Sequence, residues 1–161
     1  MIKLKMTLTK CNTIIAYFPK GLGKKQAMAT QKLAFKGLRK FREVISPLFD
    51  ARDMKTEELR ANLKTKYPGL RGDLPPEFQE QVNEINQEFT AGLREKVTIE
   101  VGQDTLEAVR SVIEAAQEVM TCSEDKVEAS GYDILMLDEA IDDIKDAIVA
   151  DNEKSKGKDK S

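Results

Sequence analysis

The side chains that most often carry out catalysis are scarce in this sequence. Its 161 residues include no histidine, so the commonest general base and the commonest metal ligand are absent, and no Ser-His or Cys-His pair can form. Cys11 and Cys122 are the only cysteines and do not form a C-x-x-C pair, so one chain cannot assemble a thiolate-imidazole zinc site. We expect both thiols to be inert, half-buried residues.

Two weaker candidates for a catalytic or binding motif consist of carboxylates and of glycines. Glu84 with Glu88, or Asp138 with Asp142, could supply a carboxylate pair for acid-base catalysis or for a di-metal centre. The usual di-iron motif, however, is Glu-x-x-His and needs histidine. The glycine-containing segment 20–25 lacks the G-x-x-x-x-G-K-[ST] spacing of a phosphate-binding loop, and a flexible turn explains its glycines. We therefore predict no enzymatic activity, no cofactor and no bound metal.

The charge distribution is the most informative feature of the sequence. Residues 1–42 hold eleven Lys or Arg and no Asp or Glu, whereas residues 97–153 hold sixteen acidic residues and three basic ones. Such asymmetry is typical of a nucleic-acid-binding segment, of an acidic interaction face, or of two halves that pack together and neutralise each other.

Two rows of charge within these halves are the candidate partner-binding residues. The basic row is Lys32, Lys36, Arg39 and Lys40 on one helix face, and the acidic row is Asp138, Asp142 and Asp146 at i, i+4 and i+8. For the basic row we favour a solvated face matched to the acidic helices over phosphate binding, because exposed aromatic residues are not interleaved and the sequence pI is about 5.4. For the acidic row we favour solvation, ahead of a basic partner surface and then of a magnesium site.

These residues must be positioned by a mainly helical fold. Alternation of apolar and polar residues predicts strands at about 2–9 and 96–101, and we expect them to pair because a lone strand leaves its backbone groups without partners. Thr9 is expected to cap a short helix through Phe18 that ends at Pro19 and the following glycines. A long helix follows from about Lys24, with a kink or short break at Ser46-Pro47.

The rest of the chain predicts three more helices. The turn formers of 67–76 indicate a loop, and apolar spacing then predicts a helix from Phe78 to Leu93. Asp104 resembles the cap of a helix through Met120, residues 123–130 indicate a polar connector, and the closing helix has an unbroken apolar stripe from Ile134 to Ile148. The predicted fold class is α+β, predominantly helical, with about five helices and a minimal two-stranded sheet. We expect a single domain over 1–153 and a flexible basic tail over 154–161.

The apolar segments and the N-terminus indicate where in the cell the protein is expected. No segment approaches the length of a membrane span. Residues 2–6 alternate apolar and charged side chains, unlike the apolar run of a signal peptide. We expect a cytoplasmic protein with no membrane partner.

The order of these elements, taken with three short strings, carries a family likeness. The strings are Thr7-Leu8-Thr9-Lys10, Glu95-Lys96-Val97-Thr98-Ile99-Glu100 and Ser130-Gly131-Tyr132-Asp133-Ile134-Leu135. Together with the long polar-rich helices, they resemble a group of small helical proteins from tailed bacteriophages that have no agreed activity. The likeness spans most of the chain, except for residues 67–76 and 154–161, which depart from the pattern.

The resemblance implies a phage protein that works by protein-protein contact, in virion assembly or in an accessory role. Its partner would be a phage protein, a host protein or another copy of the chain, in the host cytoplasm or in the virion. One alternative is an inhibitor of a host defence or regulatory protein that acts through the acidic C-terminal helices. Another is nucleic-acid binding through the basic N-terminal half.

Overall fold

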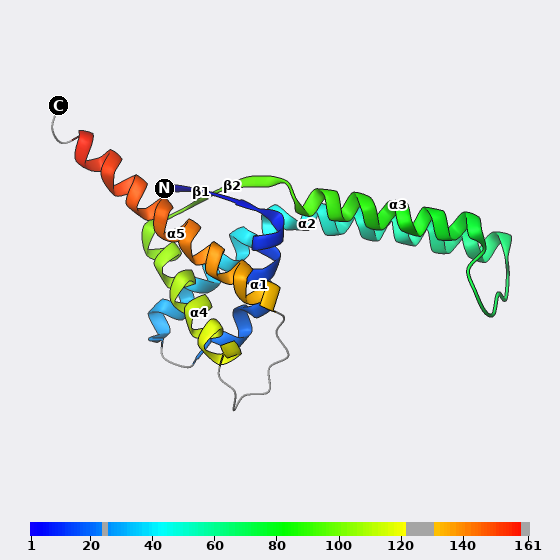
Figure 1. The fold of residues 1–161 in the computed structure, drawn as a ribbon, viewed down its shortest axis with the longest axis horizontal. Helices are drawn as coiled ribbons and strands as arrows, with labels where there is room; N and C mark the ends of the chain where they lie inside the picture. Colours follow the sequence, from blue (N-terminus) through cyan, green and yellow to red (C-terminus); the bar gives the residue numbers. More distant parts are fainter. Residues whose placement is uncertain (24–25, 122–130, 159–161) are drawn as a thin grey trace.

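The chain forms a body and a projecting arm, which Figure 1 shows side by side. The computed structural model describes residues 1–23, 26–121 and 131–158. The elements are β1 (Ile2–Thr7), α1 (Leu8–Gly21), α2 (Met28–Lys66), α3 (Pro76–Leu93), β2 (Lys96–Val101), α4 (Gln103–Thr121) and α5 (Gly131–Lys158). Within the described residues these are five helices and one two-stranded sheet, which confirms the predicted fold class.

The two strands pair antiparallel, as the sequence predicts. Ile2 lies opposite Val101, and the register continues to Thr7 opposite Lys96. The alternating pattern puts Leu4 and Ile99 in the core, while Lys3 and its neighbours on the other face are exposed. The sheet therefore closes one side of the core, where β1 packs against α5.

The cap of the first helix lies two residues earlier than expected. Thr7 is the N-cap, and its hydroxyl accepts a hydrogen bond of 3.3 Å from the backbone N–H of Lys10. Thr9 lies inside the helix and donates to the carbonyl oxygen of Leu93 at 2.9 Å, so this threonine ties α1 to the end of α3. The helix also continues through Pro19 to Gly21, because proline in the last turn removes only one backbone hydrogen bond.

Helix α4 is the centre of the body. It packs against α1, α2 and α5, and Leu106, Val109, Val112 and Ile113 on it are fully buried. Helices α2 and α5 each pack on α1 and α4 but hardly touch each other. The α1/α4 pair therefore separates α2 from α5.

Helix α2 is one uninterrupted helix of 39 residues with Pro47 inside it, so of the kink or short break expected at Ser46-Pro47 the break is not found. In Figure 1 its axis changes direction between the part in the body and the part beside α3. The helix begins at Met28, later than expected, and residues 24–25 lie outside the described part. None of the described helices is both long and apolar enough to cross a membrane.

The last two helices differ from the prediction at their ends. Asp104 lies in the first turn of α4, which begins at Gln103, so it is not the cap. Helix α5 continues through Lys158, so residues 154–158 of the expected tail are helical, with Lys156 and Lys158 in the last turn, where cations suit the helix dipole. The expected connector at 123–130, Cys122 and residues 159–161 lie outside the described residues.

The arm, residues 50–91, consists of the second half of α2, the connector 67–75 and all but the last two residues of α3. The two helices run antiparallel away from the body (Figure 1). Helix α3 alone has 18 residues, about 27 Å of helix. The loop expected at 67–76 is confirmed as the tip of this arm.

Gly21 allows α1 and α4 to approach closely, and this contact generates a stability prediction. A Cβ atom at Gly21 would lie 1.8 Å from the carbonyl oxygen of Val112 in α4. Because backbone would have to shift, Gly21→Ala should lower the free energy of unfolding by about 2 kcal/mol or more. Urea denaturation measures this, with Gly157→Ala as the control, since a Cβ there meets nothing within 4 Å. Equal stability of the two variants would contradict the packing described.

Candidate functional site

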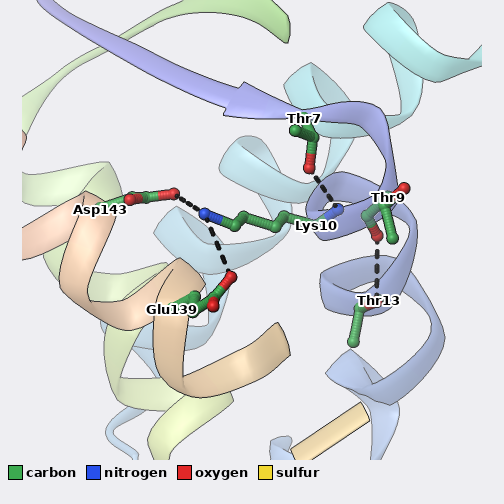
Figure 2. Close-up of polar contacts among 6 residues, drawn as sticks. All are labelled: Thr7, Thr9, Lys10, Thr13, Glu139 and Asp143. Carbon is green, nitrogen blue, oxygen red and sulfur yellow. Dashed lines mark hydrogen bonds and ion pairs between the residues drawn. The ribbon is translucent and has the colours of Figure 1, made fainter. Parts of the chain in front are cut away.

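The most buried ion pair between the basic and acidic halves of the sequence is formed by Lys10. Its Nζ atom lies 2.8 Å from a carboxylate oxygen of Asp143 and 3.6 Å from one of Glu139, both on α5 (Figure 2). The Lys10 side chain is only 17% exposed. Burial alone would lower the pKa of Lys10, but the hydrogen bond and charge of Asp143, helped by Glu139, outweigh it and raise the pKa. This ion pair fastens α1 to α5.

Helix α5 therefore carries two acidic rows with different surroundings. Glu139 and Asp143 face Lys10, whereas the predicted row, Asp138, Asp142 and Asp146, is exposed. Asp138 accepts a hydrogen bond from the Gln117 side chain of α4. In the part of the chain that the structure describes, Asp142 and Asp146 have no ion-pair partner. The predicted row is an outward surface and takes no part in joining the two halves.

Two apolar side chains share this outward surface of α5. Leu135 is 51% exposed and Val149 is 55% exposed, and helical spacing puts both on the side of α5 that carries the acidic row. The acidic face is defined here as Leu135, Asp138, Asp142, Asp146 and Val149. It combines charge with exposed apolar surface, as protein-binding faces do.

The predicted basic row lies on the outward side of α2. Lys32, Lys36, Arg39 and Lys40 are all exposed, opposite the buried side formed by Ala34, Leu38 and Phe41. None of the four forms an ion pair with another described residue. Ion pairs between the two halves instead involve Lys10 and Lys3, which the sequence did not single out.

An aromatic side chain lies among these cations, contrary to the sequence-based expectation. Phe35 is 45% exposed, and its ring centroid lies 5.7 Å from that of Phe18. Met28, one heptad earlier on α2, is also exposed. The basic face is defined here as Met28, Lys32, Phe35, Lys36, Arg39 and Lys40. Because α1 and α4 separate α2 from α5, the basic and acidic faces point away from each other.

The arm is the third candidate surface. The apolar side chains along its two helices are called the seam here, and two helices alone cannot cover them. Leu59, Leu63, Val82 and Ile85 are only half-buried, and Phe78, 4% exposed, is the arm's one buried side chain. At the base of the arm Phe49 and Phe89 pack with ring centroids 5.3 Å apart, and the Arg52 guanidinium lies over both rings. Ion pairs Lys55–Glu88 and Lys66–Glu77 join the two helices.

A shallow hollow of about 280 Å³ lies between the two arm helices. Leu59 and Ile85 supply its apolar surface, and Glu58, Glu84 and Glu88 supply three carboxylates against the single ammonium of Lys55; Asn62 and Gln81 complete the lining. The hollow is open and mostly polar. Its shape and charge suit a protein segment with basic side chains beside an apolar stripe.

Groups that could support redox or metal chemistry are few. Cys11 is fully buried, not half-buried as expected, and burial raises the pKa of its thiol to about 12, so it stays protonated at neutral pH. Among the described residues no group of three or more Cys, Asp or Glu could hold a metal ion. Cys122 lies outside the described residues.

The Lys10 ion pair predicts a dependence of stability on pH. The pKa of Lys10 is higher in the folded than in the unfolded chain, so the ion pair stabilises at neutral pH and this stability is lost as the pH rises through the folded pKa. Lys10→Met should cost about 1 kcal/mol of unfolding free energy at pH 7, with the difference shrinking above about pH 10.5. Chemical denaturation from neutral to alkaline pH measures it.

The control for this prediction is Lys5→Met, an exposed position on β1 for which no ion pair is found among the described residues. It should change stability by less than about 0.5 kcal/mol. A Lys10→Met cost that does not change with pH would contradict an electrostatic role for Lys10.

No protein-family model, no curated protein and no solved structure matches this chain. The likeness to small phage proteins therefore remains an expectation from the sequence. The candidate surfaces are the arm, the acidic face of α5 and the basic face of α2, and each is supported by the exposure and chemistry of its own residues.

Proposed function

We propose that this protein acts without catalysis, as an assembly or accessory protein of a bacteriophage, by binding another protein through the arm. The observation that carries the proposal is the half-covered apolar seam of the arm, which extends well beyond the body (Figure 1). The phage context is supported by the sequence resemblance. The protein would act in the host cytoplasm or in the virion.

The energetics of the arm favour a partner. Its seam lies outside both hydrophobic clusters of the body, which include no side chain between residues 50 and 91. Covering apolar surface contributes about 25 cal/mol per Å², so a partner that buried about 200 Å² of it would gain roughly 5 kcal/mol before the costs of association. A third helix along the seam would complete a bundle-like core.

The lining of the hollow indicates the chemistry of the partner. Leu59 and Ile85 would contact an apolar stripe, while Glu58 and Glu84 would face basic side chains. An amphipathic helix with Lys or Arg beside its apolar face fits both features. The partner segment is therefore proposed to be a basic amphipathic helix of another protein.

Photo-crosslinking tests this proposal in cells that naturally produce the protein. A photoreactive amino acid at Asn62, in the hollow, should give a discrete adduct with one other protein, whereas the same residue at the exposed Ser111 of α4 should not. Glu58→Lys with Glu84→Lys should reduce the Asn62 adduct at least about tenfold, because both carboxylates face the partner.

Glu80→Lys is the matched control, since Glu80 is exposed on α3 but does not line the hollow. It should leave the adduct unchanged. Equal adducts at Asn62 and Ser111, or no adduct at Asn62, would contradict binding through the arm. Turnover of a substrate by the purified protein would contradict a role without catalysis.

A further inference from the structure

We propose that a second copy of this chain docks its acidic face, on α5, onto the basic face of α2, so that copies associate head to tail. This inference goes beyond the arm-mediated function and does not involve the hollow between the two arm helices. It depends on the match between two outward faces of one chain. The match has three parts: charge, length and apolar content.

The two rows have opposite charge and the same length. Lys32 and Lys40 are eight residues apart in α2, and Asp138 and Asp146 are eight residues apart in α5, so each row extends about 12 Å along its helix. Within each row charges recur every three or four residues, which keeps them on one side of the helix. Side by side, the two helices would bring each of the three carboxylates near a cation.

Apolar side chains lie among the charges on both faces. Phe35 is surrounded in sequence by Lys32, Lys36 and Arg39, while Leu135 and Val149 flank the acidic row at its two ends. Contact of Phe35 with Leu135 or Val149 would bury apolar area at one end of the acidic row, beside the paired charges. The opposite charges along the rows would then fix the orientation of the two copies.

The arrangement of the body prevents the two faces from pairing within one chain. Helices α1 and α4 lie between α2 and α5, which hardly touch. Among the described residues Lys36, Arg39, Asp142 and Asp146 have no ion-pair partner, so like charges remain side by side on each helix at some cost. When the acidic face of one copy binds the basic face of another, the pair still has one free acidic face and one free basic face. Such contacts produce rings or open chains.

Duplex nucleic acid is the competing occupant of the basic face. Phosphate binding would use Lys32, Lys36, Arg39 and Lys40 but would leave the acidic face without a role. The whole chain has a formal net charge of −2, which does not favour approach to a polyanion. A second copy accounts for both faces together.

Sedimentation velocity on the full chain tests the proposal, using variants that neutralise one face each. Lys36→Gln with Arg39→Gln removes charge from the basic face, and Asp142→Asn with Asp146→Asn removes it from the acidic face. The unaltered chain should associate beyond a dimer as its concentration rises, and less so when salt is raised from about 0.05 to about 0.5 M. Each double variant alone should associate at least about tenfold more weakly.

Mixing the two variants gives the most specific result. Each retains the face that the other lacks, so an equimolar mixture should form a 1:1 pair that does not grow further. Lys20→Gln with Lys64→Gln, two exposed lysines outside the basic face, is the matched control and should associate like the unaltered chain. Circular dichroism should show that all variants fold.

Several outcomes would overturn the proposal. The proposal is overturned if the chain stays monomeric at all concentrations. It is also overturned if neither double variant affects association, or if the mixture does not pair. A monomeric chain that shifts duplex DNA in a gel only while Lys36 and Arg39 are intact would assign the basic face to nucleic acid. Glu58→Lys with Glu84→Lys on the arm should not change self-association, so failure here is distinguishable from failure of the proposed function.

Discussion

The architecture depends on the burial of α4. Its apolar side, with Leu106, Val109 and Ile113, needs cover from several elements at once, and α1, α5 and the first half of α2 supply it. Residues beyond this core do not pack against it, so the second half of α2 can extend into an arm. The same constraint places α2 and α5 on separate sides of the α1/α4 pair and turns their charged sides outward.

Charge has two separate roles in this arrangement. Lys10, Glu139 and Asp143 form the partly buried cluster that joins α1 to α5 (Figure 2). The exposed charged rows on α2 and α5 lie outside that cluster. Most of the charge asymmetry between the two halves of the sequence is therefore at the surface. Binding surfaces that are separate from the core can change without loss of the fold, because surface substitutions usually cost little stability. The proposed contacts with a partner and with a second copy are both of this kind.

The sequence predicted features that depend on local patterns. The strand at 96–101, its pairing with the first strand, the loop at the arm tip and the stripe of α5 all follow from periodicity and turn residues. The sequence did not predict features that depend on tertiary contacts: Thr9 lies inside α1 and bonds to the carbonyl oxygen of Leu93, and Lys10 pairs with Glu139 and Asp143 and not with the neighbouring acidic row. One signal was visible: Glu139 and Asp143, at i and i+4, flank the apolar stripe of α5.

Hydrogen exchange resolved to single amides tests the central claim, that the arm is an extension outside the core whose seam is left for a partner. Amides of α4 should exchange only by global unfolding, whereas those of residues 50–91 should exchange at least about a hundredfold faster, because their helices open locally. Protection of the arm equal to that of α4 in the isolated protein would mean that the arm belongs to the core, and would contradict the account.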